Sequence, residues 1–81
     1  MDTSTTQVTA VTNLNILQGI KRRDTTKNAV ARKAGIPATT FDRKINGKAD
    51  FTLRELGAIA EALHLTLGDI LPVELLAARA A

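Results

Sequence analysis

The sequence predicts an all-α fold, a compact bundle of about five helices in one small domain, on three observations. The chain has 81 residues, enough to bury a single modest core. Apolar residues make up 44% of it but only 2% of residues are aromatic, so Ala, Leu, Ile and Val fill that core, and this composition favours close helix packing over a β-sandwich. Apolar residues also recur every three or four positions, which is the helical period.

Basic side chains are concentrated in the middle of the chain. The whole chain has a formal charge of +3, but residues 21–48 hold nine Lys or Arg against Asp24 and Asp42, a net charge of +7. The remaining residues carry a net charge of −4. A basic block beside acidic flanks predicts a positively charged face that meets a polyanion, although such a run can be no more than a solvated surface.

The composition argues against several classes of protein. Without cysteine the chain forms neither disulfides nor thiolate metal sites, and no apolar run reaches the roughly 20 residues of a membrane span. The only histidine, His64, stands where a helix is expected to end, and the chain has no glycine-rich phosphate loop. We therefore expect a cytoplasmic protein that is not an enzyme and has no catalytic residues, metal, cofactor or small-molecule ligand.

The first part of the chain divides into an arm and a helix. Residues 1–9 are rich in Thr, Ser and Gln and have little to bury, so we expect a flexible arm. A helix is predicted from about Val11 to Arg23, with Thr12 or Asn13 as a candidate cap. Its recurring apolar residues are Val11, Leu14, Ile16, Leu17 and Ile20. The basic run that ends this helix can complement the helix dipole or contact phosphates, and the sequence leaves both roles open.

Two short helices joined by a sharp turn are predicted over residues 26–47. Gly35 can take the left-handed conformation that a helix C-terminus often needs, and Pro37 suits the first turn of the next helix. A narrow stripe of small residues lets a second helix approach the first closely; its members are Val30, Ala31 and Ala34. This pattern is typical of a helix-turn-helix, a device for reading DNA, although a plain corner in a small bundle gives the same turn.

The second helix of this pair has two different sides. On a helical wheel Phe41 and Ile45 lie together, and Thr39 and Arg43 lie roughly opposite. The first pair is predicted to face the core and the second to face a ligand. Thr40 and Asn46 flank the second pair.

Two places beside this pair suit phosphate groups. The residues Asp24-Thr25-Thr26 can cap the first helix, whose free amides with Lys27 and Asn28 beside them form a small anion site. After the second helix, which Gly47 is expected to end, Asn46 and Lys48 are further candidates for phosphate contact.

The remaining residues predict supporting helices. Residues 52–55 have the capping-box pattern, so a helix is expected to begin at about Leu53, and Gly57 is a candidate for close backbone packing. Residues 66–69 repeat the cap pattern for a short helix, and residues 73–81 favour a helix that packs on the core or on a second subunit. The predicted buried stripe of the longer helix is Leu53, Leu56, Ile59, Ala60 and Leu63.

From about Leu14 to Leu71 the chain resembles the Cro and lambda-type phage repressors, within the wider family of Xre-like regulators. The matching segments are Ala31–Ile36, Thr39–Phe41, Arg43–Lys48, Phe51–Leu56, Ile59–Leu63 and Asp69–Leu71. The pattern departs at Lys44, where many members have an apolar residue, because here the apolar residue is Ile45. The sequence leaves the register of the helix near Lys44 open.

The resemblance implies a sequence-specific transcriptional regulator of the phage or prophage repressor type, with a double-stranded DNA operator as its partner. The domain is expected to span residues 10–81, and a homodimer is expected on DNA because one reading helix covers only a few base pairs. The alternative for this fold is an antitoxin or a protein-interaction adaptor. The expected base-reading residues are Ala38, Thr39, Thr40 and Arg43, and the expected backbone contacts are Arg22, Arg23, Thr26, Lys27, Asn28, Lys44, Asn46 and Lys48.

Overall fold

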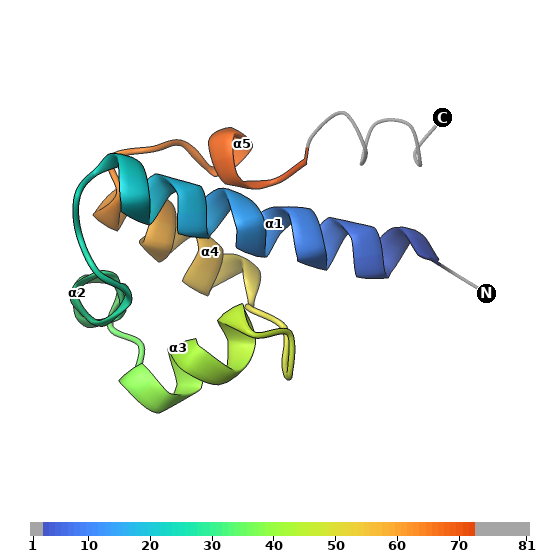
Figure 1. Ribbon diagram of the computed structural model, residues 1–81, viewed down its shortest axis with the longest axis horizontal. Coiled ribbons are helices and arrows are strands. Elements are labelled where there is room, and N and C mark those ends of the chain that lie inside the picture. The colour runs from blue at the N-terminus through green and yellow to red at the C-terminus, as the bar shows by residue number, and fades with distance from the viewer. Residues whose placement is uncertain (1–2, 73–81) are drawn as a thin grey trace.

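Five helices run through residues 3–72, the part of the chain that the computed structural model describes (Figure 1). They are α1 (Thr3–Arg22), α2 (Lys27–Ala34), α3 (Ala38–Ile45), α4 (Leu53–Ala62) and α5 (Leu67–Ile70). The same residues contain no strand, so the predicted all-α class is confirmed. None of these helices is both long and apolar enough to cross a membrane. The predicted helical tail at 73–81 lies outside the described residues.

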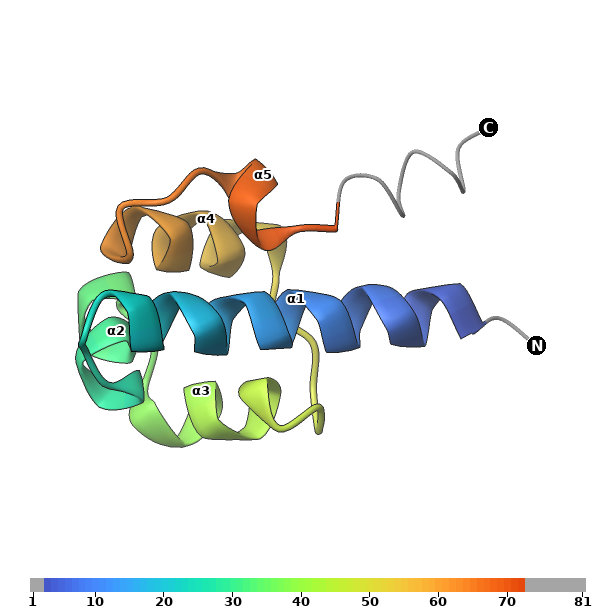
Figure 2. The ribbon, with the colours of Figure 1, turned by 45° about the horizontal axis from the view of Figure 1, so that its top comes forward.

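The long helix α1 spans the bundle and packs against α5 and α2. Both views place α3 on one side of α1 and α5 on the other (Figures 1 and 2). Helix α2 packs against both α3 and α4, and α5 packs against α1 and α4. The helix-turn-helix pair is therefore joined to the bundle mainly through α2, and α3 lies at its edge.

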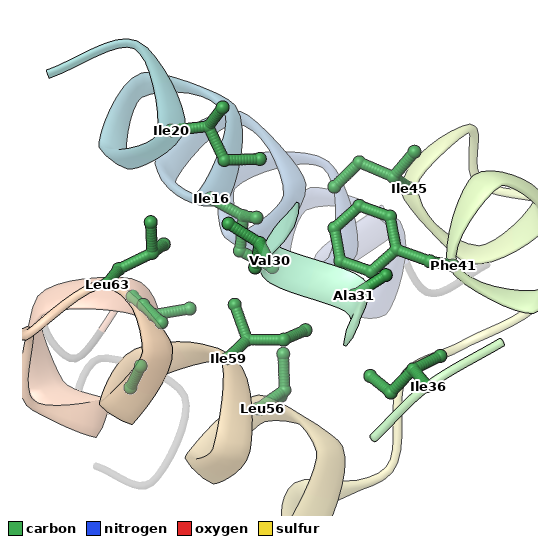
Figure 3. Packing of buried hydrophobic residues seen from close by; sticks show 12 residues of the cluster. Ile16, Ile20, Val30, Ala31, Ile36, Phe41, Ile45, Leu56, Ile59 and Leu63 are labelled. Carbon is green, nitrogen blue, oxygen red and sulfur yellow. The ribbon is translucent and has the colours of Figure 1, made fainter. Parts of the chain in front are cut away.

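The core draws apolar side chains from all five helices and from the turn between α2 and α3 (Figure 3). Phe41 is only 1% exposed, and its ring centroid lies 5.5 Å from that of Phe51. Of the predicted interior positions of the helix-turn-helix, Val30, Ala31 and Ile45 are buried as expected, whereas Ala34 is only half-buried. The buried apolar residues are Ile16, Ile20, Val30, Ala31, Ile36, Phe41, Ile45, Leu56, Ile59, Ala60, Leu63 and Ile70.

Helix α1 differs from its prediction in its buried face. Of its apolar residues only Ile16 and Ile20 are buried, whereas Val11, Leu14 and Leu17 are 36%, 53% and 36% exposed. Residues three apart on a helix fall about 60° short of a full turn, so a repeat of three moves steadily around the helix and off the buried face. The spacing of three identified a helix correctly but not the side that packs.

The start of α1 also differs from its prediction. The helix begins at Thr3, so residues 3–9 of the expected arm are helical. Asn13 therefore lies inside the helix and is not a helix cap, and both Thr12 and Asn13 are buried polar residues on the inner face.

Two further predictions for α4 are wrong. Leu53, its first residue, is 65% exposed and does not belong to the core. At Gly57 an added Cβ would meet no described atom within 4 Å, so this glycine does not serve close packing. That role falls to Gly19 of α1, where a Cβ would lie 3.1 Å from Leu63 and 3.2 Å from Leu65.

Candidate nucleic-acid interface

The start of α2 is capped and carries no acidic residue. The Thr26 hydroxyl accepts a hydrogen bond from the Ala29 amide at 3.1 Å, as the sequence predicted for this residue. Lys27 and Asn28 are exposed in the first turn. The positive end of the helix dipole and the Lys27 ammonium thus lie together at the surface, an arrangement that attracts anions.

The end of α2 has the geometry that the sequence predicted, whereas Pro37 stands one position before the first turn of α3. Gly35 has φ 75° and ψ 26°, a left-handed conformation. The Gly35 amide donates to the Arg32 carbonyl at 3.2 Å, and the Ile36 amide donates to the Ala31 carbonyl at 2.9 Å, which is the Schellman pattern. Ile36 is buried and fixes the corner to the core.

Helix α3 begins without a cap. Pro37 occupies the capping position, no described side chain accepts a bond from the first amides, and the first turn has no acidic residue. Ala38 and Thr39 are exposed there. The amino end of α3 therefore offers backbone donors and positive dipole charge to a ligand.

The two sides of α3 separate as the helical wheel predicted. Phe41 and Ile45 are 1% and 5% exposed, whereas Thr39 and Arg43 are at the surface. Thr40 is half-buried, at the border between the two sides. Of the predicted base-reading residues, Ala38, Thr39 and Arg43 are thus exposed on one helix.

An asparagine from α1 holds the carboxyl end of α3. The Asn13 side-chain amide donates to the backbone carbonyls of Lys44 at 3.1 Å and Ile45 at 3.3 Å. Asn13 is only 8% exposed, so these bonds are shielded from water. The sequence offered Asn13 only as one of two candidate helix caps, and the signal for its actual role is a polar residue on the same inner face as Ile16.

A salt bridge joins α3 to α4. The Lys44 ammonium lies 2.7 Å from a Glu55 carboxylate oxygen, with the two side chains 16% and 21% exposed. Hydrogen bonds from Lys44 and from the Thr52 amide lower the pKa of Glu55 below its ordinary value. Because its ammonium is engaged inside the protein, we withdraw Lys44 as a DNA backbone contact. The register is also settled, since Ile45 fills the core and Lys44 reaches a partner at its border.

The other predicted backbone contacts lie at the surface, though not all are free. The Arg23 guanidinium donates to the His64 carbonyl at 3.2 Å, just after α4 ends. Gly47 has φ 82° and ends α3 in the same pattern as Gly35 ends α2, with the Lys48 amide donating to the Arg43 carbonyl at 2.9 Å. The exposed members of the set are Arg22, Arg23, Thr26, Lys27, Asn28, Asn46 and Lys48.

Within residues 3–72 no three His, Asp or Glu side chains are grouped so that they could hold a metal ion. At the surface, α2 instead has Lys27 in its first turn. Helix α3 has an uncapped start and exposes Thr39 and Arg43. Hydrogen-bond donors and positive charge on an edge helix suit a polyanion that also presents base edges.

Comparison with known proteins gives one match. A family model for the Cro/C1-type helix-turn-helix DNA-binding domain matches residues 15–74, which is most of the chain. The matched segment contains the whole of α2 to α5 and the carboxyl part of α1. No curated protein and no solved structure matches the chain significantly.

Proposed function

Because the chain belongs to the family of Cro/C1-type helix-turn-helix DNA-binding domains, we propose that it is a sequence-specific repressor of transcription of the phage or prophage type, acting on a double-stranded DNA operator. The observation that carries this proposal is the exposed side of α3. There Thr39 and Arg43 face outward, opposite the buried Phe41 and Ile45, at the edge of the bundle. A helix held in this way can enter the major groove.

Base reading falls to the exposed residues of α3. The Arg43 guanidinium can make two parallel hydrogen bonds to the major-groove edge of guanine. Thr39, one turn earlier, contacts a neighbouring base through its hydroxyl or methyl group. Ala38 and Thr40 complete the reading set, Ala38 by apolar contact with a thymine methyl and Thr40 from the border of the buried side.

Backbone anchoring falls to the residues around α3. The amino end of α2, with Lys27 and Asn28, suits one phosphate, and Asn46 and Lys48 beyond α3 suit another. The net charge of +7 on residues 21–48 supports a strong, salt-dependent attraction to DNA. We further propose that the protein binds as a homodimer, so that two reading helices meet two half-sites about one helical turn apart.

The test begins with selection of preferred duplexes from a random pool, followed by competition titrations against a scrambled duplex at several salt concentrations. Arg43→Ala should weaken binding to the preferred site by about 1–3 kcal/mol and relax the base preference there. Lys48→Ala is the matched control, because it removes a nearby positive charge that we assign to phosphate. It should weaken both duplexes equally and lower the salt dependence by about one charge.

Two results would contradict the proposal. If the wild-type protein enriches no sequence and shifts no duplex at low salt, the adaptor or antitoxin alternative takes its place. If Arg43→Ala weakens both duplexes equally while Lys48→Ala changes base preference, the reading side of α3 is wrongly assigned.

A further inference from the structure

The outer side of α1 carries exposed apolar side chains and no charged residue. Leu14 is 53% exposed, and Val11 and Leu17 are each 36% exposed. Between Thr3 and Ile20 the helix has no charged residue at all. The outward side of a helix in a small soluble domain is normally polar or charged, so this face has the composition of a surface that becomes covered.

A groove lies beside this face and reaches the carboxyl end of α3. Its volume is about 600 Å³. Leu14 and Leu17 of α1 line one side, and Ile45, Asn46 and Gly47 at the end of α3 line the other. Asp50 is the one charged residue among the described residues that line the groove. A side chain seated in the groove would therefore touch both the apolar face of α1 and the end of the helix that we assign to base reading.

We propose that a second copy of this chain docks on this surface, with the apolar face of α1 packed against α1 of the partner about a two-fold axis. A two-fold interface must be self-complementary, and here a projecting Leu14 and an adjoining groove lie on the same surface. Leu14 of one copy can thus enter the groove of the other. The reason for dimerisation rests on the proposed function, but the contact itself does not require DNA.

The charge distribution favours a second copy at this face over an acidic protein or DNA. Residues 21–48 carry a net charge of +7, so two copies repel each other wherever the basic side chains of this block would meet. The residues of this block that line the groove are uncharged: Ile45, Asn46 and Gly47. The stretch from Thr3 to Ile20 has no charge and lets two basic domains approach with the least repulsion. An acidic protein or DNA would instead be attracted to the basic block.

The first test uses the absence of native cysteine. A single Leu14→Cys substitution can form a disulfide only between two copies, and near a two-fold axis the two sulfurs lie close together. Leu53→Cys is the matched control, because Leu53 is 65% exposed but begins α4, outside the groove. Mild oxidation, with and without DNA, should give covalent dimers of Leu14→Cys and few of Leu53→Cys. Equal yields from the two variants, or no dimer from Leu14→Cys, would overturn the proposal.

The second test measures association directly by sedimentation equilibrium. Leu14→Gln should weaken self-association by about tenfold or more, whereas Leu53→Gln should leave it unchanged. Thermal unfolding by circular dichroism checks that both variants stay folded, which is expected because both leucines are exposed. A wild-type protein that stays monomeric both free and on its preferred duplex contradicts the proposal and leaves the groove to another occupant, such as residues 73–81 of the same chain.

DNA binding separates this proposal from the proposed function. Leu14→Gln should bind a duplex with one half-site as the wild type does, and lose only the tighter binding to a duplex with two half-sites. One outcome is that the wild-type protein forms dimers but binds no duplex, and that Leu14→Gln abolishes the dimers. The interface then stands and the proposed function fails. If DNA binding is intact while Leu14→Gln changes neither association nor two-site binding, the interface fails and the proposed function stands.

Discussion

Helices α3 and α4 are joined by a salt bridge, yet they begin in opposite ways. At the start of α4 the Thr52 hydroxyl accepts from the Glu55 amide at 3.1 Å, and the Glu55 carboxylate accepts from the Thr52 amide at 2.8 Å. This complete capping box occupies backbone donors and places a negative charge at the positive end of the helix. At the start of α3 no described side chain does either.

The difference separates a structural helix start from one that is available to a ligand. Helix α5 begins as α4 does, with a box formed by Thr66 and Asp69, so the supporting helices are closed. Helix α3 is held instead at its carboxyl end, by Asn13 and by the Lys44–Glu55 salt bridge. Because the stability of its position comes from that end, its amino end can stay free for a phosphate or a base edge.

The strongest test of this comparison is to give α3 the negative charge that α4 already has. Ala38→Glu should weaken binding to DNA by several kcal/mol, about 2 or more, because it places like charge against the phosphates. The same change should leave stability equal or raise it by about 0.3–1 kcal/mol through the helix dipole. Leu53→Glu, at the corresponding first position of α4, is the control and should not alter DNA affinity. Fluorescence anisotropy titration and urea unfolding measure the two quantities, and equal DNA affinities for the two variants would argue against an open start on α3.

The next test removes the support at the other end of α3. Asn13→Ala leaves two backbone carbonyls without their donor and should lower the free energy of unfolding by about 1–3 kcal/mol. It should also weaken DNA binding, because the end of α3 loses its fixed position. Asn15→Ala is a matched control, since the Asn15 amide donates to the Ile70 carbonyl of α5 at 2.7 Å. Its stability should fall similarly while its DNA affinity, measured well below the unfolding temperature, stays unchanged. A DNA defect of equal size in both variants would mean that Asn13 acts only through overall stability.

A smaller effect is expected at the threonines of the two helix starts. Thr52→Ala removes a cap and should lower the free energy of unfolding by about 1 kcal/mol. Thr39→Ala lies in the uncapped first turn of α3 and should change stability by less than about 0.5 kcal/mol. For DNA binding we expect the larger effect from Thr39→Ala, because only this variant should alter the base preference. Stability losses of the same size in urea unfolding would show that Thr39 also caps its helix.

The smallest effect is the pH dependence of the closed helix starts. Hydrogen bonds from Lys44 and Thr52 lower the pKa of Glu55 below its ordinary 4.5, and bonds from Thr66 lower the pKa of Asp69 below its ordinary 3.8. A lowered pKa in the folded state stabilises the fold above the unfolded-state pKa, and this stabilisation is lost as pH falls through the folded value. Stability should therefore decline as the pH falls below about 4.5, and Glu55→Gln should decline less steeply in thermal unfolding. A steeper decline in the variant would contradict this assignment.

Much of the helix-turn-helix and of its supports is determined by local sequence. Gly35 needs only its neighbours to end α2, and the capping box of Thr52 and Glu55 needs only one helical turn. The positions of Phe41 and Arg43 on opposite sides follow from the helical period alone. Such features depend on residues a few positions apart, so they can be predicted without knowing the fold.

The tertiary structure decided what depends on distant partners. Asn13 and the carbonyl of Lys44 are 31 residues apart in the chain, and nothing near Asn13 indicates that contact. From the sequence we expected Lys44 to contact a phosphate, but in the fold it forms a salt bridge with Glu55 of α4. The period of α1 identified a helix, but only its packing against α5 and α2 determined that Ile16 is buried and Leu14 exposed. A periodic pattern specifies the element, whereas the side that packs is chosen by the neighbours that the whole chain brings to it.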